Sequence, residues 1–395
     1  MPAFQPNRFV SPAVLKAVSR ENLCRLLEPF RAYLTEHGYT LPKSSASAEL
    51  DHEKLTRALL AAGEDIPPAL AEALFFIDSV ALDENLDVLM DDARRIPGIK
   101  LRPDVTTADL ALELWLADKS ILFRRYSEQN LVTKRSYESF VSSSFPCPSI
   151  KLSDKNLRAM EDEMNEWFSK RKRGRGSRIM TCQKGSAIWF LIRHGEVFTR
   201  QGCLEGDDST SVFFRPEKHD VVVFDQSYGE IRVNAVGVRV KELYRRVFGK
   251  HFFGSDQFFQ PRAKYTLEPL RAADEAALVC SDVAGMESVT LEEVRWDWQD
   301  EYGGEDRLKN ANVFAALKKR ALALPDKPRL VRATFRVKFT ATKVGRAVVI
   351  CDGNQSQYAR DADCTQVEEW LAKRGFIVKR KVTANEAGLP ALDVA

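Results

Sequence analysis

Turn residues alternate with β-branched and aromatic runs over residues 185–259, and this segment constrains the fold more than any other part of the chain. Two extended runs, residues 220–225 and 230–234, flank the turn-forming residues 226–229, which predicts a β-hairpin. A second hairpin is predicted around His194-Gly195, because strand-forming residues lie on both sides and glycine accepts the positive φ of a tight turn.

Helical periodicity follows the hairpin of residues 220–234 and also dominates the N-terminal third of the chain. Residues 238–248 place apolar side chains at helical spacing, and Gly249 follows where a helix would end. Near the N-terminus the same spacing predicts helices over residues 20–37, 50–62, 67–80, 85–95 and 107–117, the last ending either at residue 117 or at about residue 123. We expect an all-helical domain that acts as a scaffold or docks a protein partner.

Strands and helices are both predicted beyond residue 266. Strands are expected over residues 276–282, 289–298 and 376–382, helices over 312–324 and 365–373, and a hairpin over 329–340 and 347–351. The predicted fold class is α+β, a helical N-terminal domain followed by mixed, mainly antiparallel hairpin and helix domains. The expected divisions are residues 1–140 (helical), 141–178 (linker, capped helix and basic loop), 179–265 (central mixed domain) and 266–395 (C-terminal α+β domain).

A cluster of basic residues gives the most specific binding signal. It follows a helix that Ser153 caps and that is predicted to run to about residue 170. Six of the nine residues from 170 to 178 are basic, namely Lys170, Arg171, Lys172, Arg173, Arg175 and Arg178. A flexible cationic loop suits a phosphate backbone, since guanidinium groups bind phosphate in a bidentate manner. The alternatives are a solvated linker and contact with an acidic protein partner.

A second basic row is predicted on the hairpin of residues 329–340. Arg332, Arg336 and Lys338 alternate there with apolar residues, so one face of the hairpin is basic. This row is either a second phosphate-facing surface or the ordinary solvated face of an antiparallel sheet.

The hairpin of residues 220–234 resembles the core of PD-(D/E)xK nucleases. In that family an Asp on one strand and a Glu or Gln followed by x-Lys on the next bind a divalent cation and orient water. The resemblance implies that Asp220 and Glu230 would hold Mg²⁺. Arg232 replaces the family's lysine, and arginine stays protonated and cannot act as a base. A solvated hairpin face and a degenerate core that only binds are the other interpretations.

Residues 191–196 (LIRHGE) resemble the RHG signature of the histidine phosphatase superfamily. The resemblance implies that His194 would be the phosphoryl-accepting nucleophile and Arg193 a phosphate clamp. The family also needs a second histidine, for which His219 and His251 are the candidates. The alternative is a plain hairpin turn.

Length and composition indicate a folded protein of several domains. The chain has 395 residues, of which 44% are hydrophobic and 29% charged. Its net charge of +3 is small, so any affinity for nucleic acid must come from a local patch. Seven cysteines without CxxC spacing predict reduced thiols, and no signal peptide or apolar membrane span is evident, so we expect a cytoplasmic protein without a membrane partner.

The signatures of common ATPases, dinucleotide-binding proteins and zinc hydrolases are not found in the sequence. We therefore interpret the chain as a cytoplasmic, non-catalytic component that binds the DNA or RNA backbone or a protein partner, without a cofactor. It is compatible with an accessory subunit of a bacterial multi-protein system such as phage defence. The enzymatic alternatives are a Mg²⁺-dependent nuclease at Asp220 and Glu230 and a phosphatase at His194.

Overall fold

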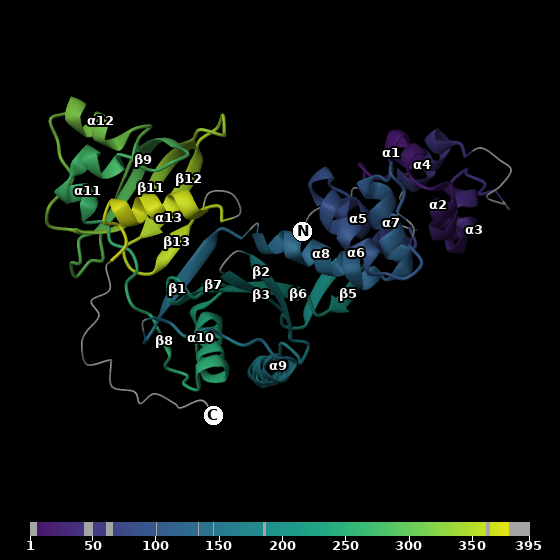
Figure 1. Cartoon of the computed structure of the whole chain (residues 1–395), viewed down its shortest axis with the longest axis horizontal. Coiled ribbons are helices and arrows are strands. Elements are labelled where there is room, and N and C mark those ends of the chain that lie inside the picture. Colours follow the sequence, from purple (N-terminus) through teal and green to yellow (C-terminus); the bar gives the residue numbers. More distant parts are fainter. Residues whose placement is uncertain are drawn as a thin grey trace. The chain divides into compact units, whose positions relative to one another are not determined.

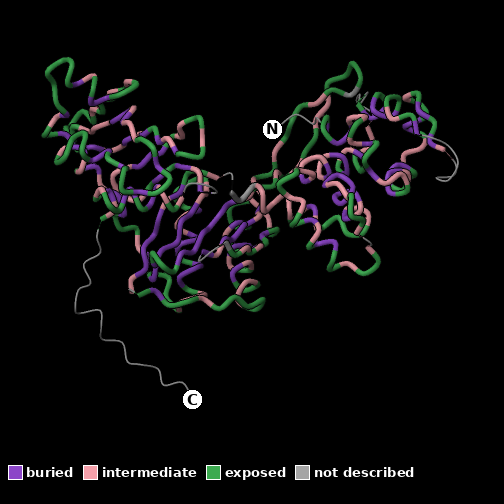
Figure 2. The backbone as a smooth tube through the Cα atoms, turned by 45° about the horizontal axis from the view of Figure 1, so that its top comes forward, coloured by how far each residue is buried: buried purple, intermediate pink, exposed green. Residues whose placement is uncertain are grey.

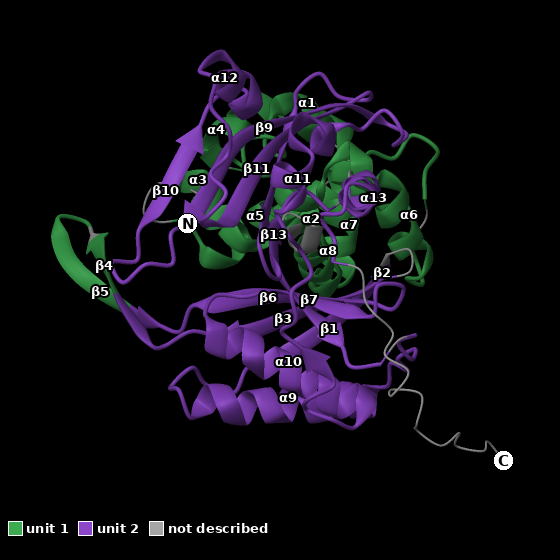
Figure 3. Cartoon of the chain, turned by 90° about the vertical axis from the view of Figure 1, so that its left-hand side faces the viewer, with its two compact units in different colours: residues 1–130, 201–212 green, residues 131–200, 213–395 purple. Residues whose placement is uncertain are grey.

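The computed structural model describes residues 6–42, 50–60, 66–99, 101–132, 134–144, 146–184, 187–360 and 364–378. The chain forms two compact units (Figure 3). The helical unit comprises Met1–Asn130 with Gln201–Val212, and the sheet unit comprises Leu131–Arg200 with Phe213–Ala395. Both contain helices, and the strands of the sheet unit pair antiparallel, so the predicted α+β class is confirmed.

The helical unit is built from short amphipathic helices around leucine-rich contacts (Figure 1). Its elements are α1 (Pro12–Ala17), α2 (Arg20–Leu27), η1 (Glu28–Phe30), α3 (Arg31–Glu36), α4 (His52–Leu60), α5 (Pro68–Val80), η2 (Asp83–Asn85), α6 (Leu86–Arg94), α7 (Thr107–Ala117) and α8 (Lys119–Val132). The single helix predicted over residues 20–37 is wrong. Pro29 has no N–H to continue the ladder, and the chain passes through η1 before α3 begins. The helix α7 ends at Ala117, the first of its two predicted ends, and α8 is a separate helix.

The described strands of the sheet unit form one 11-stranded antiparallel sheet. Its order is β10-β9-β11-β12-β13-β1-β7-β6-β3-β2, with β8 beside β1. The strands are β1 (Ser136–Ser142), β2 (Arg178–Lys184), β3 (Ala187–Gly195), β6 (Glu217–Asp225), β7 (Glu230–Asn234), β8 (Phe259–Gln260), β9 (Met286–Asp297), β10 (Glu305–Lys309), β11 (Arg329–Phe339), β12 (Arg346–Cys351) and β13 (Gln355–Gln357). A separate two-stranded ribbon consists of β4 (Thr199–Glu205) and β5 (Asp208–Phe214).

Helices complete the cores of the sheet unit. Apolar residues of α9 (Asp154–Ser169) and α10 (Val238–Phe253) pack with those of β3, β6 and β7, and α13 (Cys364–Lys373) packs with β11 and β12. The smaller helices are α11 (Pro269–Ala272), η3 (Asp274–Leu278) and α12 (Val313–Lys319). Figure 2 shows long buried stretches of backbone along the strands of the sheet. No helix in the described part of the chain combines the length and apolar character that crossing a membrane requires.

Several predicted elements differ from the structure. His194-Gly195 forms no tight turn, because both residues belong to β3, which pairs with β2 on one side and β6 on the other. Residues 276–282 form the end of η3 and a turn rather than a strand. The predicted helix 312–324 ends at Lys319. Ile377 makes only an isolated bridge to Tyr265, and the last four residues of the predicted strand 376–382 lie outside the described residues.

The division into units also differs from the predicted domain boundaries. β1 lies in a segment predicted to end the helical domain and begin a linker, yet it pairs with β7 and β13. Through β1, the strands predicted for separate central and C-terminal domains belong to one sheet.

Candidate nucleic-acid interface

The six basic residues predicted to contact phosphate lie together on one turn, from Lys170 to Arg178, which joins α9 to β2. We call it the cationic turn. Ser153 caps α9 by accepting a hydrogen bond from the Asn156 amide. At the other end, the amides of Arg171 and Arg173 donate to the Phe168 carbonyl, at 3.0 Å each. The turn is therefore tied to the end of α9 by backbone hydrogen bonds.

A side chain from a later part of the sequence contacts the backbone of the cationic turn. Arg215 follows β5, and its Nη1 donates to the carbonyls of Lys172 at 2.5 Å and Glu196 at 2.8 Å. Arg173 forms an ion pair with Glu196, with 3.3 Å between Nη2 and Oε2. Lys172 has φ of 61° and Gly174 has φ of 83°, which lets the chain reverse direction. Sequence analysis missed Arg215, because a single arginine far along the chain carries no local signal.

The remaining charges of the turn face solvent. Lys170, Lys172 and Arg175 are exposed and form no ion pair with any residue that the structure describes. The Arg171 guanidinium lies 3.6 Å from the centroid of the Trp167 ring, a cation–π contact that orients it without neutralising it. Arg178 pairs with Glu161 at 3.5 Å but keeps 60% of its side chain exposed. Five of the six cations are therefore accessible to an anion in solution. Arg173 is instead used in an ion pair within the protein.

Gly195 lets the strand β3 approach the cationic turn closely. A Cβ atom at this position would lie 2.5 Å from the Arg173 carbonyl oxygen and 2.6 Å from Cδ of Arg215. We expect Gly195→Ala to lower the free energy of unfolding by about 1–3 kcal/mol, because backbone atoms must shift to relieve the overlap. Urea denaturation measures this change. Gly202→Ala is the control, since its Cβ would meet nothing within 4 Å, and equal losses in the two variants would contradict the prediction.

Two of the three cations in the second basic row are paired with carboxylates. Arg336 forms two hydrogen bonds to Glu292, at 2.9 and 3.0 Å, and Lys338 pairs with Glu287 at 2.6 Å. Arg332 lies next to Cys351, its cross-strand neighbour. These acidic partners lie on β9, and the pairing of β9 with β11 was not predicted from the sequence. Arg336 and Lys338 are therefore neutralised on this sheet face, and Arg332 alone has no carboxylate partner among the described residues, so the row offers less charge to a phosphate than the cationic turn does.

Asp220 and Glu230, the expected Mg²⁺ ligands, do not meet. Asp225 is the residue opposite Glu230, and Asp220, five positions away on β6, points to the other face of the sheet. There it accepts hydrogen bonds on Oδ2, at 2.8 Å from the Tyr244 hydroxyl, while Glu230 binds Lys264. Among the described residues no group of three or more His, Cys, Asp or Glu is placed to hold a metal. The nuclease arrangement expected from these two carboxylates is therefore not assembled.

His194 lies in the core beneath α9. Only 3% of the residue is exposed, its ring stacks on Phe168 with 4.3 Å between centroids, and its Nε2 lies 2.9 Å from Oδ2 of Asp220. A nucleophile must reach its substrate, and this ring does not reach the surface. The expected second histidine is not beside it either, because His219 faces the opposite side of the sheet and His251 binds Glu163 at 2.9 Å. The geometry does not support phosphatase chemistry here.

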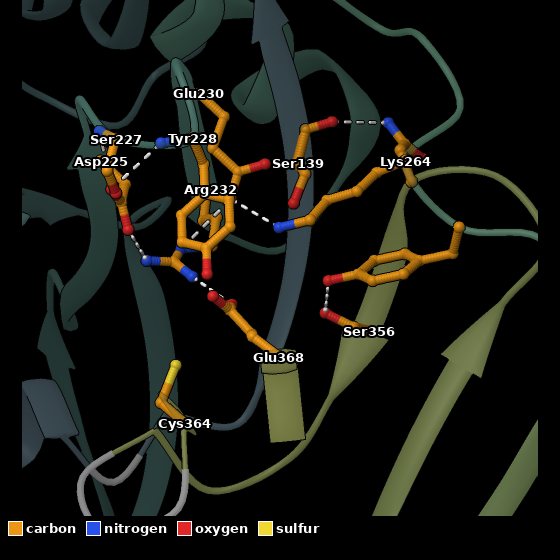
Figure 4. Close-up of polar contacts among 12 residues, drawn as sticks. Ser139, Asp225, Ser227, Tyr228, Glu230, Arg232, Lys264, Ser356, Cys364 and Glu368 are labelled. Carbon is orange, nitrogen blue, oxygen red and sulfur yellow. Dashed lines mark hydrogen bonds and ion pairs between the residues drawn. The ribbon is translucent and has the colours of Figure 1, made fainter. Parts of the chain in front are cut away.

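Glu230 and Arg232 belong instead to a buried ionic cluster (Figure 4). It contains three acidic and three basic side chains, namely Asp225, Glu230, Glu368, Arg232, Lys264 and Arg360. Arg232 donates to Oδ2 of Asp225 at 3.0 Å and to Oε1 of Glu368 at 2.6 Å. Lys264 donates to Oε1 of Glu230 at 2.6 Å. The charges balance, as buried charges must, so we assign the cluster to structure rather than to catalysis.

The ionic cluster sets the protonation of its members. Burial alone would raise the pKa of Glu368, but the positive charges of Arg232, Lys264 and Arg360 outweigh it and lower the pKa to about 2. Burial, together with the negative charge of Glu368, raises the pKa of Tyr228 to about 12. Tyr358 and Arg360 bring further hydrogen bonds from the end of the chain. Glu368 is therefore ionised at neutral pH, while its negative charge and those of its acidic or phenolic neighbours raise the pKa of Arg232, Lys264 and Arg360, which stay protonated.

No protein-family model matches this sequence, and no curated protein matches it.

Proposed function

We propose that the protein is a cytoplasmic, non-catalytic component that binds nucleic acid through its phosphate backbone, with the cationic turn as the principal contact. One observation carries the proposal. Six cations within nine residues are held on a single ordered turn, and three of them have no ion-pair partner among the described residues. A solvated linker does not need a set of anchoring contacts, whereas a phosphate-binding surface gains affinity from being held in place.

The physical basis of binding is the release of counterions. Each phosphate that a lysine or arginine neutralises releases condensed cations, so affinity falls as salt rises. Arg171 and Arg175 can form bidentate hydrogen bonds to phosphate oxygens, and Lys170 and Lys172 add point charges. The net charge of the chain is only +3, so this attraction is local and does not arise from a general cationic field.

The test is a titration of labelled duplex and single-stranded DNA and RNA at several salt concentrations, with and without Mg²⁺. The variant carries Lys170→Gln, Lys172→Asn and Arg175→Gln, where asparagine tolerates the positive φ of position 172. We expect weaker binding and a salt-dependence slope smaller by about 2 to 3, because each lost contact removes about 0.7 on single strands and 0.9 on duplex.

A matched control removes the same charge elsewhere. Lys318, Lys319 and Arg320 are three consecutive exposed cations at the end of α12, and changing all three to Gln should leave the slope unchanged. The proposal fails if the two triple variants bind alike. Denaturing gels run on the same samples add a second outcome, because strands shortened only in the presence of Mg²⁺ would support a nuclease instead.

A further inference from the structure

Two exposed phenylalanines lie at the base of the β4–β5 ribbon. Phe198 precedes β4 and Phe213 lies near the end of β5, and they are 61% and 58% exposed. Their rings are nearly parallel, with 6.2 Å between centroids and 21° between planes. Exposing two neighbouring aromatic rings leaves apolar surface in water, and such surface is usually used for recognition.

The same two segments that anchor the cationic turn also carry these rings. Phe198 comes two residues after Glu196, which pairs with Arg173, and Phe213 comes two residues before Arg215. Two residues of extended chain span at most about 7 Å. The Arg215 side chain donates to the Lys172 carbonyl, and the backbone at Gly195 lies against the Arg173 carbonyl, so both segments leave the turn from points of direct contact. The rings and the turn all belong to the sheet unit, so their adjacency is a property of one compact body.

We infer that the ligand of this surface is single-stranded DNA or RNA, with its phosphates on the cationic turn and its bases stacked on Phe198 and Phe213. This rests on the proposed function. A single strand can turn its bases outward and offer their faces to aromatic rings, and every base has such a face, so the binding tolerates many sequences. In a duplex the bases are already stacked on one another, and the rings would find only the sugar–phosphate surface.

Charge favours this ligand over an apolar protein partner. A protein that covered the rings would also have to cover or neutralise the exposed Lys170, Lys172 and Arg175. A single strand satisfies both features at once, because phosphates and bases alternate along it. The anchored arrangement also agrees with the way in which cationic grooves and stacking rings are combined in proteins that bind single strands.

The experiment compares a labelled single-stranded oligothymidylate with a labelled duplex of mixed sequence, at one salt concentration and over a salt series. The variant Phe198→Ala with Phe213→Ala should bind the single strand at least about fivefold more weakly, which is the lower end of what losing one stacked base costs. Its duplex affinity and its salt slope should stay those of the native protein. Phe198→Tyr with Phe213→Tyr should keep single-strand affinity, because the aromatic faces remain.

Leu204→Ala is the control for loss of exposed apolar surface, since Leu204 is 70% exposed on β4 and should not contribute to stacking. If the cationic variant loses its salt slope while the double alanine variant binds the single strand as the native protein does, the base-stacking inference fails and the proposed function stands. If the native protein binds neither oligonucleotide at low salt, both fail. Equal weakening for duplex and single strand would also overturn the inference, and would point to a disturbed turn.

Discussion

Replacing Arg232 with methionine is expected to lower the free energy of unfolding by about 3–5 kcal/mol, the cost of breaking a buried ion pair. The Arg232 side chain is 4% exposed, and its guanidinium is the partner of both Asp225 and Glu368. Methionine fills most of the volume but leaves the Asp225 carboxylate without an ion pair among the described residues, and it leaves the Glu368 carboxylate with Arg360 as its remaining ion-pair partner there. The two carboxylates can relieve the loss of the positive charge only by taking up protons or by admitting water, and each of these costs free energy. Urea denaturation followed by circular dichroism gives the difference.

Arg336→Met is the matched control. Like Arg232, Arg336 donates two hydrogen bonds to carboxylate oxygens, here both on Glu292, but 45% of its side chain is exposed. An exposed ion pair contributes about 0–1 kcal/mol, so this variant should stay close to the native protein. Similar losses in the two variants would mean that burial does not set the strength of the Arg232 contacts. A folded Arg232→Met protein of native stability would show that the buried cluster is relaxed by water or by proton uptake at little cost.

The sequence predicted those parts of the fold whose signals are local. The hairpin of β6 and β7 was found because its turn residues and its extended runs lie within fifteen positions of one another. The end of α10 was missed, because Gly249 has a different role from the one expected. A Cβ there would lie 2.5 Å from the Ser255 carbonyl oxygen, so this glycine serves close packing, and the helix ends at Gly254, where φ is 73°. Both glycines look alike in the sequence.

Prediction from local sequence signals was even more limited for the candidate sites than for the fold. The cationic turn was found from composition, but the side chain that contacts its backbone comes from Arg215, 43 residues beyond the carbonyl that it binds. The ionic cluster joins Arg232 to Glu368 across 136 residues and Lys264 to Glu230 across 34, so no spacing rule could connect them. His194 was expected at a hairpin turn. Its position within β3 depends on the pairing of that strand with both of its neighbours, β2 and β6, and this pairing is tertiary structure that no local sequence signal gives.

Stability at acid pH should depend on Glu368. Its pKa in the folded protein is about 2, against an ordinary value of 4.5, because the positive charges around it outweigh its burial. The pKa is lower in the folded than in the unfolded chain, so the stabilisation is complete above about pH 4.5 and is lost as pH falls toward 2. A pKa difference of this size corresponds to a contribution on the order of 3 kcal/mol at neutral pH.

Glu368→Gln should remove this contribution, so the variant should be less stable than the native protein at pH 7 and should lose less further stability on acidification. The measurement is a set of urea denaturation curves between pH 7 and pH 3 for both proteins, with Glu292→Gln as the control for losing an exposed glutamate that binds an arginine. The native and Glu368→Gln curves should converge as pH falls, because protonation does to the native glutamate what the substitution does permanently. Curves that stay parallel over this range would show that Glu368 is not held ionised by Arg232, Lys264 and Arg360.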